Sequence, residues 1–135
     1  MKIIDLNEEQ ASLIDDRLAE YDENYNKFKL EGSVNIGIEE DGKLVAGLLV
    51  RITAFRILYV NTVFVDEEYR GRGFGRLLIN ETERRAVKLG ANLIRLDTFN
   101  YQGKEFYEAL GYECVGSYDN ETDGYSEYFF LKRLG

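Results

Sequence analysis

Apolar residues near the start of the chain are spaced as on one side of a helix. They recur three or four positions apart, at Ala11, Ile14, Leu18 and Tyr21. This spacing predicts a helix over residues 8–23, and Asn7 followed by Gln10 is typical of a capping box at its start. The short apolar segment Met1–Ile4 in front of it is predicted to be a strand.

After residue 33 the pattern changes to an alternation of apolar and polar residues, which is typical of strands. Residues 34–38 and 44–52 are predicted strands, joined by Asp41 and Gly42, a pair that favours a two-residue hairpin turn. Residues 44–52 and 57–65 are apolar at nearly every position, so both faces of these strands should be buried. Helices are therefore expected above and below the sheet.

The second half of the chain alternates between helices and strands. Helices are predicted over residues 74–89 and 104–110, ending at Gly90 and Gly111, and strands over residues 93–98, 112–118 and 125–131. The resulting order is a helix, three antiparallel strands, a helix, a strand, a helix and two strands. It predicts one domain over residues 1–135 of the α+β class, with a mixed, mostly antiparallel sheet flanked by helices.

Length and composition agree with a single folded domain. The 135 residues are 44% hydrophobic, which is enough for a core. No apolar run approaches the roughly 18–20 residues of a membrane span, and the acidic N-terminus does not resemble a signal peptide. Cys114 is the single cysteine and has no partner for an internal disulfide, which fits a reducing compartment. We therefore expect a cytoplasmic protein without a membrane partner.

Missing residue types and uneven charge exclude several classes of function. Because the chain has no histidine, it lacks histidine-dependent triads, and with one cysteine no metal site is expected. The net charge of −8 argues against a nucleic-acid partner. Residues 1–50 carry 12 acidic and 5 basic side chains, whereas residues 51–110 carry 8 acidic and 10 basic ones. The middle segment is therefore the place where an anion would bind.

A glycine-rich turn, Arg70-Gly71-Arg72-Gly73-Phe74-Gly75, joins the strand at 57–65 to the helix at 74–89. Glycines allow a ligand to approach the backbone closely, and a helix N-terminus offers unpaired N–H groups and partial positive charge. With the neighbouring arginines, this turn predicts a phosphate site. It lacks the lysine and serine or threonine of a P-loop, and Arg76 stands where a dinucleotide fingerprint needs its third glycine.

The turn matches the pattern [QR]-x-x-G-x-[GA] and resembles the pyrophosphate loop of the GNAT superfamily of N-acetyltransferases. A second block, LDTFNYQGKEFYEALGYE, resembles the superfamily's next strand, a cofactor-contacting asparagine and the helix with F-Y-x-x-x-G-[FY]. The two blocks lie about thirty residues apart, as the superfamily requires. The resemblance covers nearly the whole chain and implies the GNAT acyl-CoA N-acyltransferase fold, with acetyl-CoA as cosubstrate.

The resemblance also implies a cofactor-binding set. In the superfamily a bulge splays the strand here at 57–65 from the strand at 93–98, and the pantetheine arm pairs with backbone in the gap. The implied backbone partners are Val63, Phe64 and Val65 for the pantetheine, and Gly71, Gly73, Gly75 and Arg76 for the pyrophosphate. The remaining members of the implied set are Arg70, Arg72, Phe74, Asn100 and Lys104.

The implied reaction is direct attack of an amine on the thioester carbonyl, without a covalent enzyme intermediate. Tyr107 matches the residue that protonates the departing thiolate, and a phenol suits a general acid; the other interpretation is a tyrosine packed in the core. The base stays open, because the strand at 57–65 has no carboxylate where many members carry a glutamate. A water chain or Asp97 could serve, although a surface or hairpin charge is favoured for Asp97. Cys114 is interpreted as a core or strand residue rather than a catalytic one.

Two functions stay open at this point: an N-acetyltransferase acting on a primary amine of a small molecule or a protein, and a catalytically silent CoA-binding or regulatory module. The intact loop and Tyr107 favour the enzyme. A nearer resemblance is to small bacterial GNAT proteins with L-D-T-[FL]-x-[FY]-Q. Acidic segments near residues 7–41 and 119–127 favour a cationic acceptor, or else they serve solubility alone. A homodimer is also left open.

Overall fold

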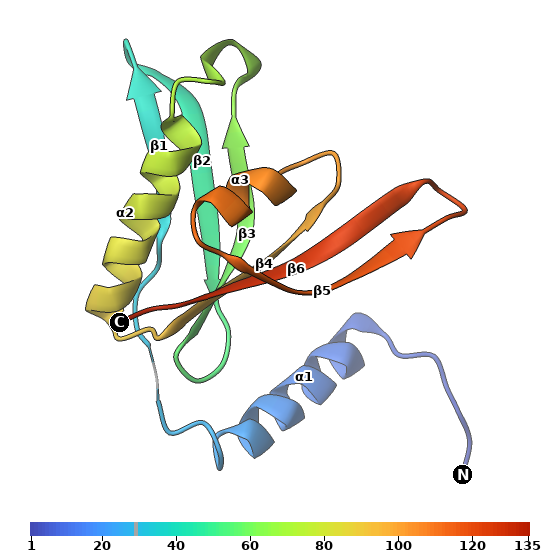
Figure 1. The fold of residues 1–135 in the computed structure, drawn as a ribbon. Helices are drawn as coiled ribbons and strands as arrows, with labels where there is room; N and C mark the ends of the chain where they lie inside the picture. Colours follow the sequence, from blue (N-terminus) through green and yellow to red (C-terminus); the bar gives the residue numbers. More distant parts are fainter. Residues whose placement is uncertain (29) are drawn as a thin grey trace.

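The computed structural model describes residues 1–28 and 30–135, and its helices and strands follow the predicted order (Figure 1). The helices are α1 (Glu8–Asp22), α2 (Phe74–Leu89) and α3 (Lys104–Ala109), with a 3₁₀ turn η1 (Glu67–Tyr69). The strands are β1 (Asn35–Glu40), β2 (Lys43–Ile52), β3 (Ile57–Val65), β4 (Leu93–Phe99), β5 (Glu113–Asn120) and β6 (Tyr125–Arg133). The α+β class and the mixed sheet flanked by helices are therefore confirmed.

The strands form one sheet in the order β1-β2-β3-β4-β6-β5, and the β3–β4 pair is parallel while the other pairs are antiparallel. β3 pairs with β4 only over Ile57–Tyr59. Directly after this stretch, Val60 and Thr62 of β3 face consecutive residues of β2, so Asn61 is the extra residue of a bulge. Because a bulge bends its strand, β3 and β4 then diverge, as Figure 1 shows.

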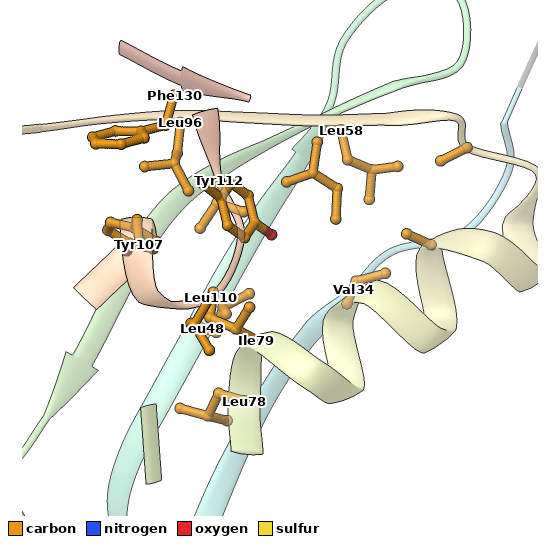
Figure 2. Packing of buried hydrophobic residues seen from close by; sticks show 14 of the residues in the cluster. Val34, Leu48, Leu58, Leu78, Ile79, Leu96, Tyr107, Leu110, Tyr112 and Phe130 are labelled. Carbon is orange, nitrogen blue, oxygen red and sulfur yellow. The ribbon is translucent and has the colours of Figure 1, made fainter. Parts of the chain in front are cut away.

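The core lies between one face of the sheet and the helices α2 and α3 (Figure 2). α2 buries Leu78, Ile79 and Ala86, which recur at helical spacing. The helix ends at Gly90, whose φ of 96° places it in the left-handed region that favours glycine. Fully burying one leucine side chain stabilises the fold by about 1.5–3 kcal/mol, so packing of this stripe holds α2 on the sheet.

Two expectations are wrong: the strand at Met1–Ile4, and helices on both faces of the sheet. α1 begins with the predicted capping box of Asn7 and Gln10, yet it has no buried residue and lies apart from the sheet (Figure 1). Met1–Ile4 is not a strand, and its side chains are exposed. The sheet therefore carries packed helices on one face only, because the turn after α1 leads that helix away from the other face. Within the described residues, no helix combines the length and apolar character needed to cross a bilayer.

Candidate active site

A cavity of about 760 Å³ opens where β3 and β4 diverge. Its walls are the second half of β3, the end of β4 and the start of α3, so the bulge at Asn61 is what creates it. The lining residues are Val60, Asn61, Thr62, Val63, Phe64, Val65, Arg70, Asp97, Thr98, Tyr101, Gln102, Gly103, Phe106 and Tyr107. Since β3 has no β4 partner beyond Tyr59, its backbone on this side is left to bond a ligand inserted between the strands.

The glycine-rich turn stands at one end of this cavity and leads into α2. Gly71 and Gly73 have φ of 77° and 84°, a region where other residues are strained, and a Cβ on either would meet no described atom within 4 Å. Gly73 is the N-cap of α2, so no side-chain hydrogen bond caps the first turn, which also has no acidic residue. An open backbone concavity that ends in uncapped N–H groups is suited to a phosphate.

The three arginines of the predicted set lie around this turn with different neighbours. Arg70 lines the cavity, and its Nε donates a hydrogen bond to the Val65 carbonyl at 2.8 Å, which fixes the guanidinium beside the end of β3. Arg72 stacks over the Tyr69 ring at 4.9 Å. Arg76 is exposed in the first turn of α2. All three therefore place positive charge near the helix N-terminus.

Position 75 requires a glycine for a different reason than positions 71 and 73 of the turn. A Cβ on Gly75 would stand 3.1 Å from Cζ of Phe106, which comes from α3 and lines the cavity. The Phe106 ring in turn contacts the Tyr107 ring edge to face at 5.0 Å between centroids. Packing therefore ties the first turn of α2 to the helix that carries the candidate acid, a link that no sequence pattern indicated.

Tyr107 combines a buried ring with a hydroxyl at the cavity. The side chain is 8% exposed and its ring contacts that of Phe106. It also packs against Tyr112 and Phe130 (Figure 2), so the core interpretation is correct for the ring. Its hydroxyl makes no hydrogen bond to the described part of the chain, in which no fully buried side-chain oxygen lacks a partner. The hydroxyl is therefore accessible from the cavity. Burial raises the pKa of Tyr107 to about 12, so the phenol keeps its proton at neutral pH.

Two polar residues of the LDTFNYQ segment hold the loop between β4 and α3. The Gly103 N–H donates to Oγ of Thr98 at 3.2 Å, and the Phe99 N–H donates to Oε1 of Gln102 at 2.8 Å. Gly103 lies close to the candidate acid, because a Cβ on it would stand 3.2 Å from the Tyr107 ring and the ring would have to shift. This segment therefore fixes where Tyr107 enters the cavity, a role that spacing alone did not predict.

Asn100 and Lys104 lie outside the lining of the cavity and have other partners. The Asn100 side-chain oxygen accepts the Ser126 N–H at 3.2 Å, which joins the loop to the start of β6. The Lys104 ammonium donates to the Glu108 carboxylate at 2.7 Å. Cys114 is a residue of strand β5, in agreement with its interpretation as a core or strand residue, and it is exposed and lies outside the lining.

Among the described residues, Asp97 is the one carboxylate that lines the cavity, and it lies on the sheet face opposite α2. Its Oδ2 accepts the hydroxyl proton of Tyr59 at 2.7 Å. The pairing of Asp97 with Phe129 places it in the middle of the β4–β6 ladder rather than near Tyr107 in the core. The carboxylate is therefore engaged by a neighbour in the described structure.

Comparison with models of protein families identifies the family of this chain. The model for the acetyltransferase (GNAT) family matches residues 2–112. The chain belongs to this family. An acetyltransferase of Agrobacterium fabrum is 36% identical over 75% of this chain and 74% of its own length. A blasticidin-S acetyltransferase of Streptomyces morookaense is 30% identical over 70% of each chain.

Solved structures agree with this membership. The GNAT chain matches the crystal structure of an acetyltransferase from Bacillus cereus with a TM-score of 0.90 and 28% identity, covering 99% of this chain and 98% of the other. A putative streptothricin acetyltransferase from Bacillus anthracis, solved in complex with acetyl coenzyme A, matches with a TM-score of 0.67 and 21% identity over 82% of this chain and 68% of that one. The second likeness is one of fold.

Proposed function

We propose that this GNAT acetyltransferase moves the acetyl group of acetyl-CoA to a primary amine on a cationic acceptor. The observation that carries the proposal is the β3–β4 cleft, whose lining includes both Tyr107 and Arg70, the residue that begins the turn before the uncapped N-terminus of α2. Acetyl-CoA supplies a thioester, whose carbonyl carbon an amine can attack directly. The residues present fit this group, because the cleft offers unpaired strand backbone and the turn offers an open anion site.

The cosubstrate would be held by backbone more than by side chains. Gly71 and Gly73 leave room for the pyrophosphate, and the N–H groups of Gly75 and Arg76 point from the first turn of α2. The backbone of Val63, Phe64 and Val65, which line the cleft, would pair with the amide groups of the pantetheine arm. Arg70, Arg72 and Arg76 would add positive charge around the phosphates, with Phe74 stacked on Tyr69 below the turn.

Asn100 and Lys104 remain in the proposed cofactor-binding set, although neither side chain lines the cleft. Each has a partner within the chain, Ser126 for Asn100 and Glu108 for Lys104. A contact between either side chain and the cosubstrate would therefore need that hydrogen bond to be shared or broken.

Tyr107 would act on the leaving sulfur. Its hydroxyl is accessible from the cleft and makes no hydrogen bond to the described residues, and it keeps its proton because burial of the side chain raises its pKa to about 12. An ordinary thiol has a pKa near ~8.5, so complete proton transfer from this phenol to a thiolate is uphill. The phenol therefore acts mainly as a hydrogen-bond donor that stabilises negative charge on the sulfur.

The acceptor would arrive from the sheet face opposite α2. Asp97 lines the cleft there, and Glu127, which accepts the Tyr118 hydroxyl, lies on the same face of β6. Negative charge around the opening attracts a cation and favours binding of amines that carry a second positive group. The likeness to an acetyltransferase named for blasticidin S supports a small-molecule acceptor.

Release of the CoA thiol in the presence of an amine panel tests the proposal. Polyamines, aminoglycosides and lysine peptides should release thiol faster than neutral or acidic amines of similar size. Acetyl-CoA binding is measured separately by thermal shift. Binding without thiol release on any amine would replace the proposal with a silent CoA-binding module. A best acceptor of net negative charge would contradict the acceptor class while leaving acetyl transfer intact.

A further inference from the structure

The apolar side of helix α1 is exposed to solvent. Ile14, Leu18 and Tyr21 are 50%, 58% and 59% exposed and, with Ala11, form one stripe along the helix. We call these four residues the α1 stripe. A helix of 15 residues is marginally stable in water by itself, because most helix stability in proteins comes from packing an apolar face. The stripe therefore needs a surface to pack on.

The chain's own sheet is not placed to supply that surface. The turn after α1 continues its hydrogen bonding, with the Asn26 N–H donating to the Asp22 carbonyl at 2.8 Å. The Asn26 side chain then accepts the Phe55 N–H at 3.1 Å, and the Arg56 guanidinium lies 3.9 Å over the Phe28 ring. These contacts anchor the turn to the β2–β3 connection and direct α1 away from its own sheet (Figure 1).

The solved Bacillus cereus structure supports this position of the helix. Residues 1–22 make up about a sixth of the chain, so a different position of that segment alone would hold the TM-score below the 0.90 observed. The extended helix is therefore shared with a protein solved by crystallography. The shared helix position, together with the exposed α1 stripe of this chain, indicates a packing surface outside the chain's own sheet.

One end of the uncovered sheet face, away from Asp97 and Glu127 at the cleft, is complementary to α1 in charge and in apolar surface. Arg51, Tyr59, Arg95 and Leu131 stand side by side across four strands, and Arg133 lies two residues beyond Leu131 on the same face of β6. We call these five residues the basic face. Glu113 of β5, beside Leu131, is the one acidic residue that continues its central row in the described structure. The three arginines are exposed, while Tyr59 and Leu131 are half-buried. α1 carries six acidic side chains and one basic one, so its charge is opposite to that of this face.

We infer that two copies of the chain exchange their N-terminal helices, so that the α1 stripe of each copy packs on the basic face of the other. Each copy offers both surfaces, so one two-fold axis satisfies all of them in a closed dimer. The exchange buries the stripe, covers the basic face and pairs acidic flanks with Arg51, Arg95 and Arg133. It does not depend on which acceptor the enzyme uses.

Light scattering of the full chain after gel filtration tests the inference. The expected mass is twice 15.6 kDa. Leu18→Asp should raise the dimer dissociation constant at least about 100-fold, because the lost apolar contact occurs twice in the dimer. Leu13→Asp is the matched control: it makes the same change on the same helix, at an exposed residue outside the stripe, and should leave the dimer intact. Arg95→Glu, on the opposing surface, should also weaken the dimer.

Three results would overturn the inference. The first is a wild-type chain that stays monomeric at about 100 μM, well above ordinary dissociation constants of specific dimers. The second is an equal effect of Leu18→Asp and Leu13→Asp on the mass. The third is wild-type affinity in folded Arg95→Glu, which also decides the matter if Leu18→Asp does not fold. Far-UV circular dichroism and a cooperative melt establish folding in every variant.

Discussion

Replacing Tyr107 by Phe separates the two roles that its structure combines. The substitution keeps the ring among Phe106, Tyr112 and Phe130 and removes only the hydroxyl, which has no partner within the described residues. We therefore expect the free energy of unfolding to change by less than about 1 kcal/mol, since no intramolecular hydrogen bond is lost. Acetyl-CoA affinity should be unchanged, because the phosphate turn lies elsewhere.

The expected loss of rate follows from the pKa of this hydroxyl. A full general acid contributes about 10²–10⁴ in rate. Because the Tyr107 pKa of about 12 lies above that of an ordinary thiol, a hydrogen bond to developing negative charge is the better description. Such a bond is worth about 1.5–3 kcal/mol, and the rate of the acetyl-transfer step should fall about 10- to 150-fold. Single-turnover kinetics measure that step without interference from product release.

Tyr112→Phe is the matched control for this experiment. Its ring lies 5.8 Å from that of Tyr107 and is equally buried, but its hydroxyl donates to Glu83 at 3.3 Å and does not line the cleft. This variant should lose about 1 kcal/mol of stability and keep the transfer rate. A Tyr107→Phe rate within a factor of about two of wild type in single turnover, or equal rate losses in the two variants, would refute the reasoning.

Three further predictions concern the loop, its packing and the pH profile. Gly73→Val should abolish the stabilisation by acetyl-CoA, which is about 2.7 kcal/mol at a ligand concentration of ~100 Kd. Gly124→Val controls for backbone strain, because Gly124 has a φ of 77° and equally open surroundings, and this variant should keep the stabilisation by acetyl-CoA. Gly75→Ala should lower the melting temperature, because its Cβ would stand 3.1 Å from Phe106. Adding Phe106→Leu should restore part of the lost melting temperature. A Gly75→Ala variant that melts at the wild-type temperature would contradict this contact. The kcat/KM of wild type should rise with pH as the amine, with a pKa near ~10, loses its proton. Because the Tyr107 pKa is raised to about 12, a falling limb below pH 10 that disappears in Tyr107→Phe would contradict that assignment.

Local patterns were sufficient for the elements and for the phosphate turn. The Asn7–Gln10 capping box, the hairpin turn at Asp41-Gly42 and the helix stop at Gly90 depend on side-chain and backbone preferences a few residues apart. The left-handed φ of Gly71 and Gly73 follows from the same local chemistry. These features were therefore predictable from the sequence, as was the α+β class with its element order.

The bulge and the cleft depend on how the strands pair in the folded protein. Nothing in the letters of Ile57–Val65 marks Asn61 as the extra residue, because a bulge is defined by the partner strand that it faces. The ties from Gly75 to Phe106, and from Thr98 and Gln102 to the loop before Tyr107, join segments that only folding brings together. The resemblance to the superfamily implied a bulge and a cleft here, but not the contacts that hold them.

The helix α1 shows the limit of the sequence most clearly. Apolar periodicity at Ile14 and Leu18 correctly predicted a helix, but both side chains are exposed in the structure. A periodic pattern specifies which side of a helix requires packing, but it carries no information about which surface provides it. That surface depends on the direction of the chain after Asp22, which the anchors at Asn26 and Phe28 decide through contacts with Phe55 and Arg56.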